Sequence, residues 1–145
     1  MQSGALGKEY QDGEIIIHEG AQGDCMYVIQ KGKVEVFARV NDQEIPLAEL
    51  SAGDFFGEMA VFEQSVRSTS VRALGQARVL TVDKRTLLYR MQEDPSLSFR
   101  FLQKMSTRIR QLDGQLAQLY RYKEQASATT MIEKKSTLNI ASYAA

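Results

Sequence analysis

The first half of the chain alternates short apolar segments, rich in Val and Ile, with turns that contain Gly, Asp or Asn. Turns of this kind recur roughly every 8 to 12 residues, which is typical of an all-β sandwich, barrel or jelly roll. Around Val34 apolar and charged residues alternate, so one face of that strand is expected to be buried. Turns are expected at Gly32, Asn41-Asp42 and Gly75, among other positions. The pattern predicts strands at residues 15–17, 26–29, 34–37, 45–50, 70–73 and 79–82.

The apolar pattern changes to a helical period after Val82. Asp83 is a suitable N-cap for a short helix, and Asp94-Pro95 supplies a second cap with proline at the first helical position. A longer helix is therefore expected from Pro95 to about Tyr122. Residues 123–145 are rich in Ser, Thr, Ala and Lys without a sustained period, so we expect a mobile or loosely docked polar tail there.

One face of the expected long helix carries apolar residues at alternating steps of three and four. This narrow stripe is the a/d pattern of a coiled coil, although Gly114 lies within it and it spans only about two and a half heptads. Packing of the stripe on the β domain is the alternative interpretation. We favour a homodimer whose interface is this stripe, called the seam below. The seam residues are Leu102, Met105, Ile109, Leu112, Leu116 and Leu119.

The charge balance and the apolar content exclude several partners. Lys plus Arg equals Asp plus Glu at 18 each in 145 residues, so no excess positive charge is available for nucleic-acid phosphates, and direct nucleic-acid binding is not expected. The N-terminal residues lack the pattern of a signal peptide, and no run of about 18 apolar residues could cross a membrane. The sequence therefore predicts a cytoplasmic protein with one folded domain and no membrane contact.

Cys25 and His18 are the single cysteine and the single histidine of the chain. A metal centre needs several such ligands, and a Ser-His or Cys-His nucleophile needs a base that this chain hardly offers. We therefore expect no catalytic residues, no metal and no cofactor, and we interpret the protein as a non-enzyme.

The residues between Phe55 and Val71 form the most informative segment. Gly57 precedes a short helical turn, Glu58 follows it directly, and Arg67 with Ser68 comes nine residues after the acid. Backbone N–H groups at such a turn can hold an anion, an arginine can grip a phosphate with two donors, and a glutamate suits a sugar hydroxyl. The alternative is an ordinary turn with a surface ion pair.

Two stretches of the sequence resemble the cyclic-nucleotide-binding domain family, and the likeness extends from about Lys8 to Leu119. The first stretch matches the family's strand and turn pattern, with glycines at fixed points, and the second matches its phosphate-binding cassette. The family's usual proline before the cassette arginine is Val66 here, which removes some stiffness from the loop. The matching stretches are Glu19-Gly20-Ala21-Gln22-Gly23-Asp24-Cys25-Met26-Tyr27-Val28-Ile29-Gln30-Lys31-Gly32-Lys33-Val34, then Phe56-Gly57-Glu58-Met59-Ala60-Val61 with Arg67-Ser68-Thr69.

The resemblance implies a mainly β fold, a double-stranded β-helix or jelly-roll β-roll with a short helix and a long C-terminal dimerisation helix. It assigns Glu58 to the ribose 2′-hydroxyl and Arg67 to the cyclic phosphate. Apolar strand residues near the base would serve equally well as plain core, and Asp113, the candidate reader of the base, could be an ordinary solvated helix residue. The other implied contacts are Gly57, Met59, Ala60, Ser68 and Thr69 at the phosphate, and Val36, Leu47 and Leu50 at the base.

Together these features predict a regulatory module that binds a cyclic nucleotide and moves its C-terminal helix in response. The resemblance to bacterial regulators favours cyclic AMP, while a carboxylate at Asp113 could also accept hydrogen bonds from guanine, so cyclic GMP stays open. We expect a binding domain at residues 8–122 and the tail at 123–145. The alternative function is a dimerisation or interaction module of the same fold that binds no nucleotide. The downstream effector is not specified by the sequence.

Overall fold

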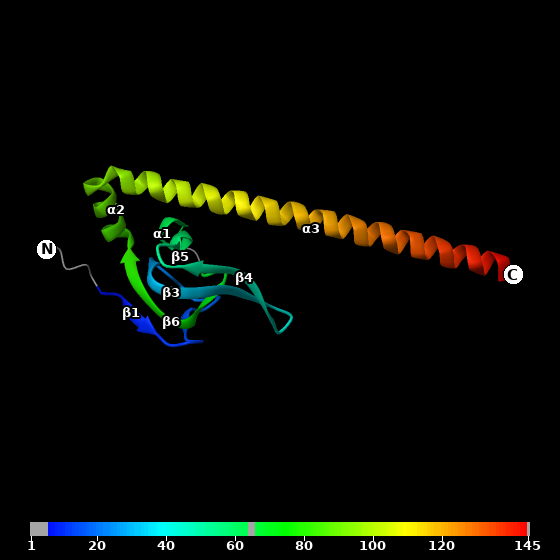
Figure 1. Cartoon of the computed structure of the whole chain (residues 1–145), viewed down its shortest axis with the longest axis horizontal. Helices are drawn as coiled ribbons and strands as arrows, with labels where there is room; N and C mark the ends of the chain where they lie inside the picture. The colour runs from blue at the N-terminus through cyan, green and yellow to red at the C-terminus, as the bar shows by residue number, and fades with distance from the viewer. Residues whose placement is uncertain (1–5, 64–65, 145) are drawn as a thin grey trace. The chain divides into compact units, whose positions relative to one another are not determined.

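The computed structural model describes residues 6–63 and 66–144, with side chains as far as residue 133. The chain divides between Glu93 and Asp94 into two compact units. The first unit contains all the strands and two short helices, and the second is a single long helix (Figure 1). The mainly β architecture with a long C-terminal helix confirms the predicted fold class at this level.

The first unit is built on one antiparallel sheet of six strands. The main path of the sheet runs β1-β6-β3-β4, while β2 pairs with β6 and β5 pairs with β3. The elements are β1 (Lys8–Tyr10), β2 (Ile15–Ile17), β3 (Cys25–Val40), β4 (Gln43–Ser51), β5 (Phe55–Phe56), α1 (Glu58–Glu63), β6 (Ser70–Asp83) and α2 (Lys84–Glu93).

Strand β3 is one continuous strand of 16 residues, whereas the sequence predicts two strands separated by a turn at Gly32. Gly32 has a φ of 84° and lies within the register shift between Lys31 and Lys33 in the pairing of β3 with β6, so it forms a bulge and not a turn. An added Cβ would lie 2.3 Å from the carbonyl oxygen of Gln76, so only glycine fits. Strand β6 is likewise continuous through Gly75, which has a φ of 68°.

The β3–β4 hairpin closes at Asn41-Asp42, as predicted. Both residues have positive φ, 51° and 61°, which is the backbone of a two-residue type I′ turn. The register shifts between Val36 and Phe37, so the predicted alternation ends there. Phe37 is buried and Val36 is half-buried.

Buried side chains from β2, β3, β5 and β6 form the hydrophobic core of the first unit. Half-buried residues, Val36 and Leu50 among them, pack against this cluster. The core residues are Ile17, Ile29, Val34, Phe56, Val71, Ala73, Ala77 and Val79.

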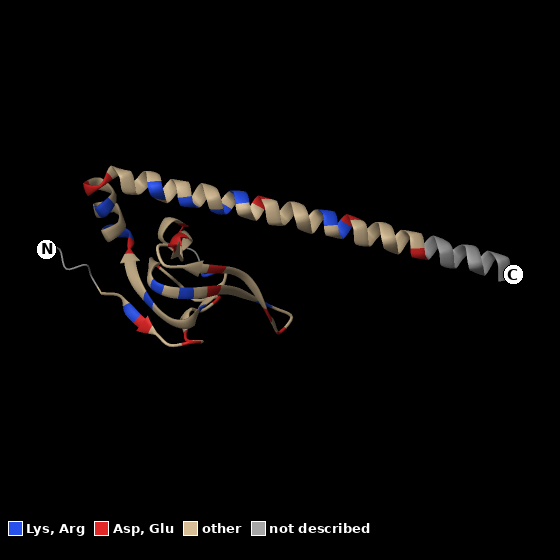
Figure 2. Cartoon of the chain, in the orientation of Figure 1, with Lys and Arg blue, Asp and Glu red and all other residues tan. Residues whose placement is uncertain are grey.

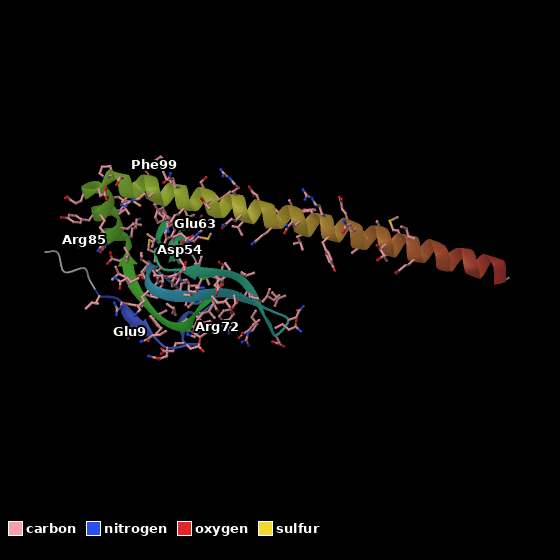
Figure 3. The ribbon with its side chains drawn as sticks, in the orientation of Figure 1. Glu9, Asp54, Glu63, Arg72, Arg85 and Phe99 are labelled. Atoms are coloured by element: carbon pink, nitrogen blue, oxygen red, sulfur yellow. The ribbon has the colours of Figure 1, made fainter. Side chains whose placement is uncertain are left out.

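Arg72 links three strands at the surface of the sheet (Figure 3). Its guanidinium donates to Glu35 of β3 at 2.6 Å and to Glu44 of β4 at 2.7 Å. It also lies 4.3 Å from the centre of the Phe37 ring. These contacts attach the β3–β4 hairpin to β6 through an exposed ion pair and a half-buried one.

Aspartates cap both C-terminal helices, as predicted. The Thr86 N–H donates to Asp83 Oδ1 at 2.7 Å ahead of α2, and the Ser96 N–H donates to Asp94 Oδ1 at 3.1 Å. Helix α3 begins at Pro95.

Helix α3 spans Pro95–Ala144, so it continues well past Tyr122, where the sequence predicts its end. The apolar seam stops at Leu119, but Ala, Gln, Glu, Lys and Met beyond it are good helix formers, and they continue the helix without a seam. The mobility of residues 123–145 and the domain limits at 8–122 stay predictions. Figure 2 shows charges of both signs along the described part of α3. Neither α3 nor any other helix in the described ranges is long and apolar enough to cross a membrane.

Candidate functional site

A tight turn before β5 positions the glycine that opens the site. Gly53 N–H donates to the Ile29 carbonyl, and Ile29 N–H donates to the Asp54 carbonyl, both at 2.9 Å. The Ser51 N–H donates to Asp54 Oδ2 at 3.1 Å. This turn places β5 in register with β3, so that Gly57 begins directly after the strand pairing.

The segment around Arg67 pairs with the loop that follows β2. Arg67 N–H donates to the Ala21 carbonyl, and the Gly20 N–H donates to the Arg67 carbonyl, both at 2.8 Å. Gln22 and Val66 form an isolated antiparallel bridge. The backbone of Arg67 is therefore fixed on both sides, and its side chain starts from a defined position.

The guanidinium of Arg67 is buried and donates to main-chain oxygens. Nη1 donates to the Gly57 carbonyl at 2.8 Å, and Nη2 donates to the Cys25 carbonyl at 2.7 Å. Nη2 also lies 3.8 Å from the Cys25 sulfur, and the guanidinium carbon is 5.7 Å from the centre of the Tyr27 ring. Arg67 is only 8% exposed. Because carbonyl oxygens are neutral, these hydrogen bonds orient the cation without neutralising it.

Tyr27 and Phe56 are the aromatic residues of the site. Their rings are stacked, with centres 5.2 Å apart and planes 15° apart. Burial, with smaller contributions from Cys25, raises the pKa of Tyr27 to about 12. The hydroxyl is therefore neutral at physiological pH, and Tyr27 offers Arg67 a ring face but no negative charge.

Gly57 and α1 form the other side of the site. Gly57 has a φ of 75°, a left-handed conformation that favours glycine and turns the chain from β5 into α1. The first N–H groups of a helix are not used by hydrogen bonds within the helix, so those of Met59 and Ala60 can donate to a ligand oxygen. Ala60 is buried, Met59 is exposed, and Glu58 is half-buried in the first turn.

The structure brings the predicted phosphate residues together. Arg67 and Gly57 are hydrogen-bonded to each other, and Glu58 follows Gly57 directly. Ser68 is exposed and Thr69 half-buried, next to Arg67 in the chain.

The predicted base residues differ in burial. Val36 and Leu50 pack against the core, whereas Leu47 is 45% exposed. Asp113 lies on α3, in the second unit, and is exposed. Contact of these residues with a base stays a prediction.

The seam residues lie on α3, and all of them except Met105 are solvent-exposed. Met105 is half-buried, and each of the other seam side chains is more than half exposed, from 53% for Leu116 to 65% for Leu102.

Cys25, Tyr27 and Gly23 belong to the site although the sequence interpretation gave them no role in it. Cys25 accepts a hydrogen bond from Arg67 through its carbonyl, Tyr27 presents a ring face to Arg67, and Gly23 has no side chain in the space that Arg67 occupies. A backbone carbonyl is common to every residue type, so it gives no signal in the sequence. Their only signal was their position inside the first stretch that resembles the family. Among the described residues, no three His, Cys, Asp or Glu side chains gather into a group that could hold a metal ion.

Known proteins are similar to this chain in sequence and in overall structure. The CRP-like cAMP-activated global transcriptional regulator of Mycobacterium tuberculosis is 29% identical over 112 residues, which are 77% of this chain and 50% of that protein. The structure of the Thermus thermophilus catabolite activator protein has a TM-score of 0.68 at 28% identity, over 77% of this chain and 53% of that one. The EAL enzyme Bd1971 in its cAMP-bound form has a TM-score of 0.54 at 39% identity, over 67% of this chain and 27% of that one.

This chain spans only about half the length of the curated mycobacterial regulator that it matches. The structural likeness nevertheless confirms the predicted jelly-roll β-roll with a long C-terminal helix. The family model described as "Cyclic nucleotide-binding domain" matches residues 7–94 of the 145, and these residues include the whole candidate site around Arg67. The chain therefore belongs to the cyclic nucleotide-binding domain family.

Proposed function

We propose that the first unit binds a cyclic nucleotide and that Arg67 holds its phosphate. The observation that carries this proposal is the burial of Arg67, which is 8% exposed and whose guanidinium is oriented by two neutral carbonyls. A buried cation is costly unless it gains a counter-charge, and a cyclic phosphate carries one negative charge. The phosphate would therefore stabilise Arg67 as strongly as Arg67 stabilises the phosphate.

The residues beside Arg67 complete the proposed phosphate and ribose contacts. Ser68 and Thr69 can donate from hydroxyl and N–H groups, and the N–H groups at the start of α1 face an anion favourably. Glu58, a pure acceptor when ionised, suits the ribose 2′-hydroxyl. An anion site and an acceptor side by side fit a nucleotide better than a simple phosphate.

The proposed base contacts are less closely tied to the site. Val36, Leu47 and Leu50 would provide apolar contact, and Asp113 would read the base edge. Relatives whose names refer to cAMP support cyclic AMP as the ligand, while one similar structure is named as a cGMP-bound form. We expect cyclic AMP to bind at least as tightly as cyclic GMP, and Asp113→Ala to change the ratio of the two dissociation constants. An unaltered ratio would mean that Asp113 does not contact the base.

The proposed output is regulatory and non-catalytic. Two copies would pair through the seam, because exposed apolar side chains at a/d spacing are stabilised by burial against each other. Nucleotide binding would then shift α3 between two positions through its different affinity for the two states. A cytoplasmic location and the absence of direct nucleic-acid binding stay predictions from the sequence.

Calorimetric titration tests the proposed binding directly. The purified protein is titrated with cyclic AMP, cyclic GMP and 5′-AMP, which keeps the adenine and the ribose but has an open phosphate monoester in place of the cyclic diester. We expect heat of binding for a cyclic nucleotide and at least about tenfold weaker binding of 5′-AMP. If neither cyclic nucleotide gives heat of binding, the result favours the alternative, an interaction module of the same fold that binds no nucleotide.

A further inference from the structure

Gly23 lies directly against the guanidinium of Arg67. A Cβ atom at this position would come within 2.2 Å of Nε, 2.4 Å of Cζ and 2.6 Å of Nη2 of Arg67. These separations are far below van der Waals contact, so any larger residue at 23 requires a movement. The atoms in the way are the end of a flexible side chain, and therefore the guanidinium is the group that would move.

The backbone gives no other reason for a glycine at position 23. Gly13, Gly20 and Gly75 have φ values of 81°, 86° and 68°, and an added Cβ at each would meet nothing within 4 Å. Those glycines are explained by their left-handed backbone. Gly23 is not among the residues with positive φ, so its conformation is open to alanine, and the clearance for Arg67 is what glycine supplies.

The guanidinium is therefore enclosed on several sides by the main chain. A Cβ at Gly57 would lie 2.7 Å from Nη1, and the carbonyls of Gly57 and Cys25 accept from the two terminal nitrogens. Tyr27 contributes its ring face at 5.7 Å. We propose that Gly23 is a positioning residue, which keeps Arg67 oriented toward the phosphate by leaving it room. This inference rests on the proposed function, since the phosphate is the group that the orientation serves.

Alanine at position 23 should displace the guanidinium and break at least one of its two carbonyl hydrogen bonds. The donors that face the ligand would then be misaligned, although the β-roll keeps its core, because Gly23 is absent from the buried cluster. A displaced arginine weakens nucleotide binding through geometry, and the effect should disappear when the planar guanidinium itself is absent.

The experiment compares four full-length variants with the wild type: Gly23→Ala, Arg67→Lys, both together, and the control Gly75→Ala. Gly75→Ala strains a left-handed residue in β6 without touching Arg67, so it reports what destabilisation alone does. Each protein is titrated with cyclic AMP. We expect Gly23→Ala to weaken binding by about tenfold, and by less than about twofold in the Arg67→Lys background. Gly75→Ala should lower the melting temperature and leave the affinity unchanged.

A second measurement does not depend on the ligand. The Nε–Hε resonance of Arg67 in the ¹⁵N spectrum is assigned by its loss in Arg67→Lys. We expect it to shift or broaden in Gly23→Ala and to stay unchanged in Gly75→Ala.

Equal cyclic AMP affinities for wild type and Gly23→Ala would overturn the inference. An equal loss of cyclic AMP affinity on Gly23→Ala in the wild-type and the Arg67→Lys backgrounds would also overturn it. A wild type that binds neither cyclic nucleotide would contradict the proposed function, and an undisturbed Nε–Hε resonance would then overturn the positioning role by itself.

Discussion

Arg67 is a buried arginine whose two short hydrogen bonds both go to neutral carbonyls. Buried arginines are usually paired with an acid, because an isolated charge is costly to remove from water. Here an anionic ligand would supply the counter-charge, while the carbonyls of Gly57 and Cys25 fix the direction of the donors. The same side chain therefore connects ligand binding with the local stability of the site.

Glu58 is the residue that should distinguish ribose from deoxyribose. Glu58→Gln keeps the shape and one acceptor oxygen but removes the charge, and charge-assisted hydrogen bonds are about twice as strong as neutral ones. We expect the ratio of the dissociation constants for 2′-deoxy cyclic AMP and cyclic AMP to fall by about threefold or more. Calorimetry measures both constants. Glu63→Gln, at the other end of α1, is the matched control. An unchanged ratio in Glu58→Gln would mean that Glu58 does not contact the ribose.

The sequence predicts the charged residues of the site but not what supports them. Arg67, Glu58 and Gly57 stand in a motif whose chemistry can be interpreted residue by residue. The acceptors of the Arg67 donors are backbone carbonyls, which every residue carries, so Cys25 had no signal of its own. In the sequence, Gly23 cannot be distinguished from a glycine that is needed for a turn. Only the fold shows that Arg67 packs against Gly23.

At the scale of elements, Asp83 stabilises the start of α2, and its effect should depend on pH. The hydrogen bonds from the backbone and side chain of Thr86 lower the pKa of Asp83 below its ordinary value of 3.8. Because the folded pKa is lower than the unfolded one, the stabilisation is present above the ordinary value and is lost as the pH falls through the folded value. We expect Asp83→Ala to lower the melting temperature at neutral pH, and this difference to shrink in acid.

Thermal unfolding followed by circular dichroism, at neutral pH and at a series of pH values below the ordinary pKa of Asp83, measures this dependence. Asp83→Asn is the control, because asparagine also caps helices but does not ionise. It should keep much of the stability and lose the pH dependence. An Asp83→Ala deficit that is the same at all pH values would mean that the charge of Asp83 contributes nothing.

The seam on α3 should determine the oligomeric state. Ile109 is 56% exposed in the single chain, and a carboxylate there would be buried without a partner in a dimer. We expect Ile109→Asp to be monomeric by light scattering while circular dichroism still reports a folded β unit. Gln111→Asp, off the seam, adds the same charge and should stay dimeric. A dimeric Ile109→Asp would contradict the seam, and an unfolded one would assign α3 to the core.

The sequence predicted the existence of most elements better than their ends. Glycine marks both turns and bulges, so Gly32 and Gly75 looked like breaks between strands when they are irregularities within β3 and β6. The bulge was visible only in the pairing of the two strands, which is a long-range property. Helix α3 was predicted from its seam, which stops at Leu119. Beyond Leu119 the helix is supported by the helix propensity of its residues, and the seam gives no signal for that part.

At the scale of the whole molecule, the two units carry different features, a candidate ligand site in the first and an apolar seam in the second. The proposed regulation uses both, because a ligand changes an equilibrium only through its different affinity for two states. The proposed regulation therefore requires that Arg67 and the seam affect the same equilibrium.

The balanced charge of the chain predicts weak interaction with DNA. Its formal net charge is zero, and Figure 2 shows residues of both charge signs on the strands and along the described part of α3. Phosphate neutralisation supplies most non-specific affinity, and a neutral surface offers little of it. We expect fluorescence anisotropy with a labelled duplex at physiological salt to show no binding tighter than about micromolar. Nanomolar binding to any duplex would refute this.

The dissociation constant of cyclic AMP for Arg67→Ala, relative to the wild type, tests the central claim most directly. Arg78→Ala, which removes an exposed ion pair with Glu9, is the matched arginine control. Circular dichroism must first show that each variant is folded, since Arg67 also contributes to local structure. The account predicts that Arg67→Ala weakens binding by about tenfold or more, that Arg67→Lys recovers only part of it, and that Arg78→Ala matches the wild type. Equal dissociation constants for folded Arg67→Ala and wild type would contradict the account.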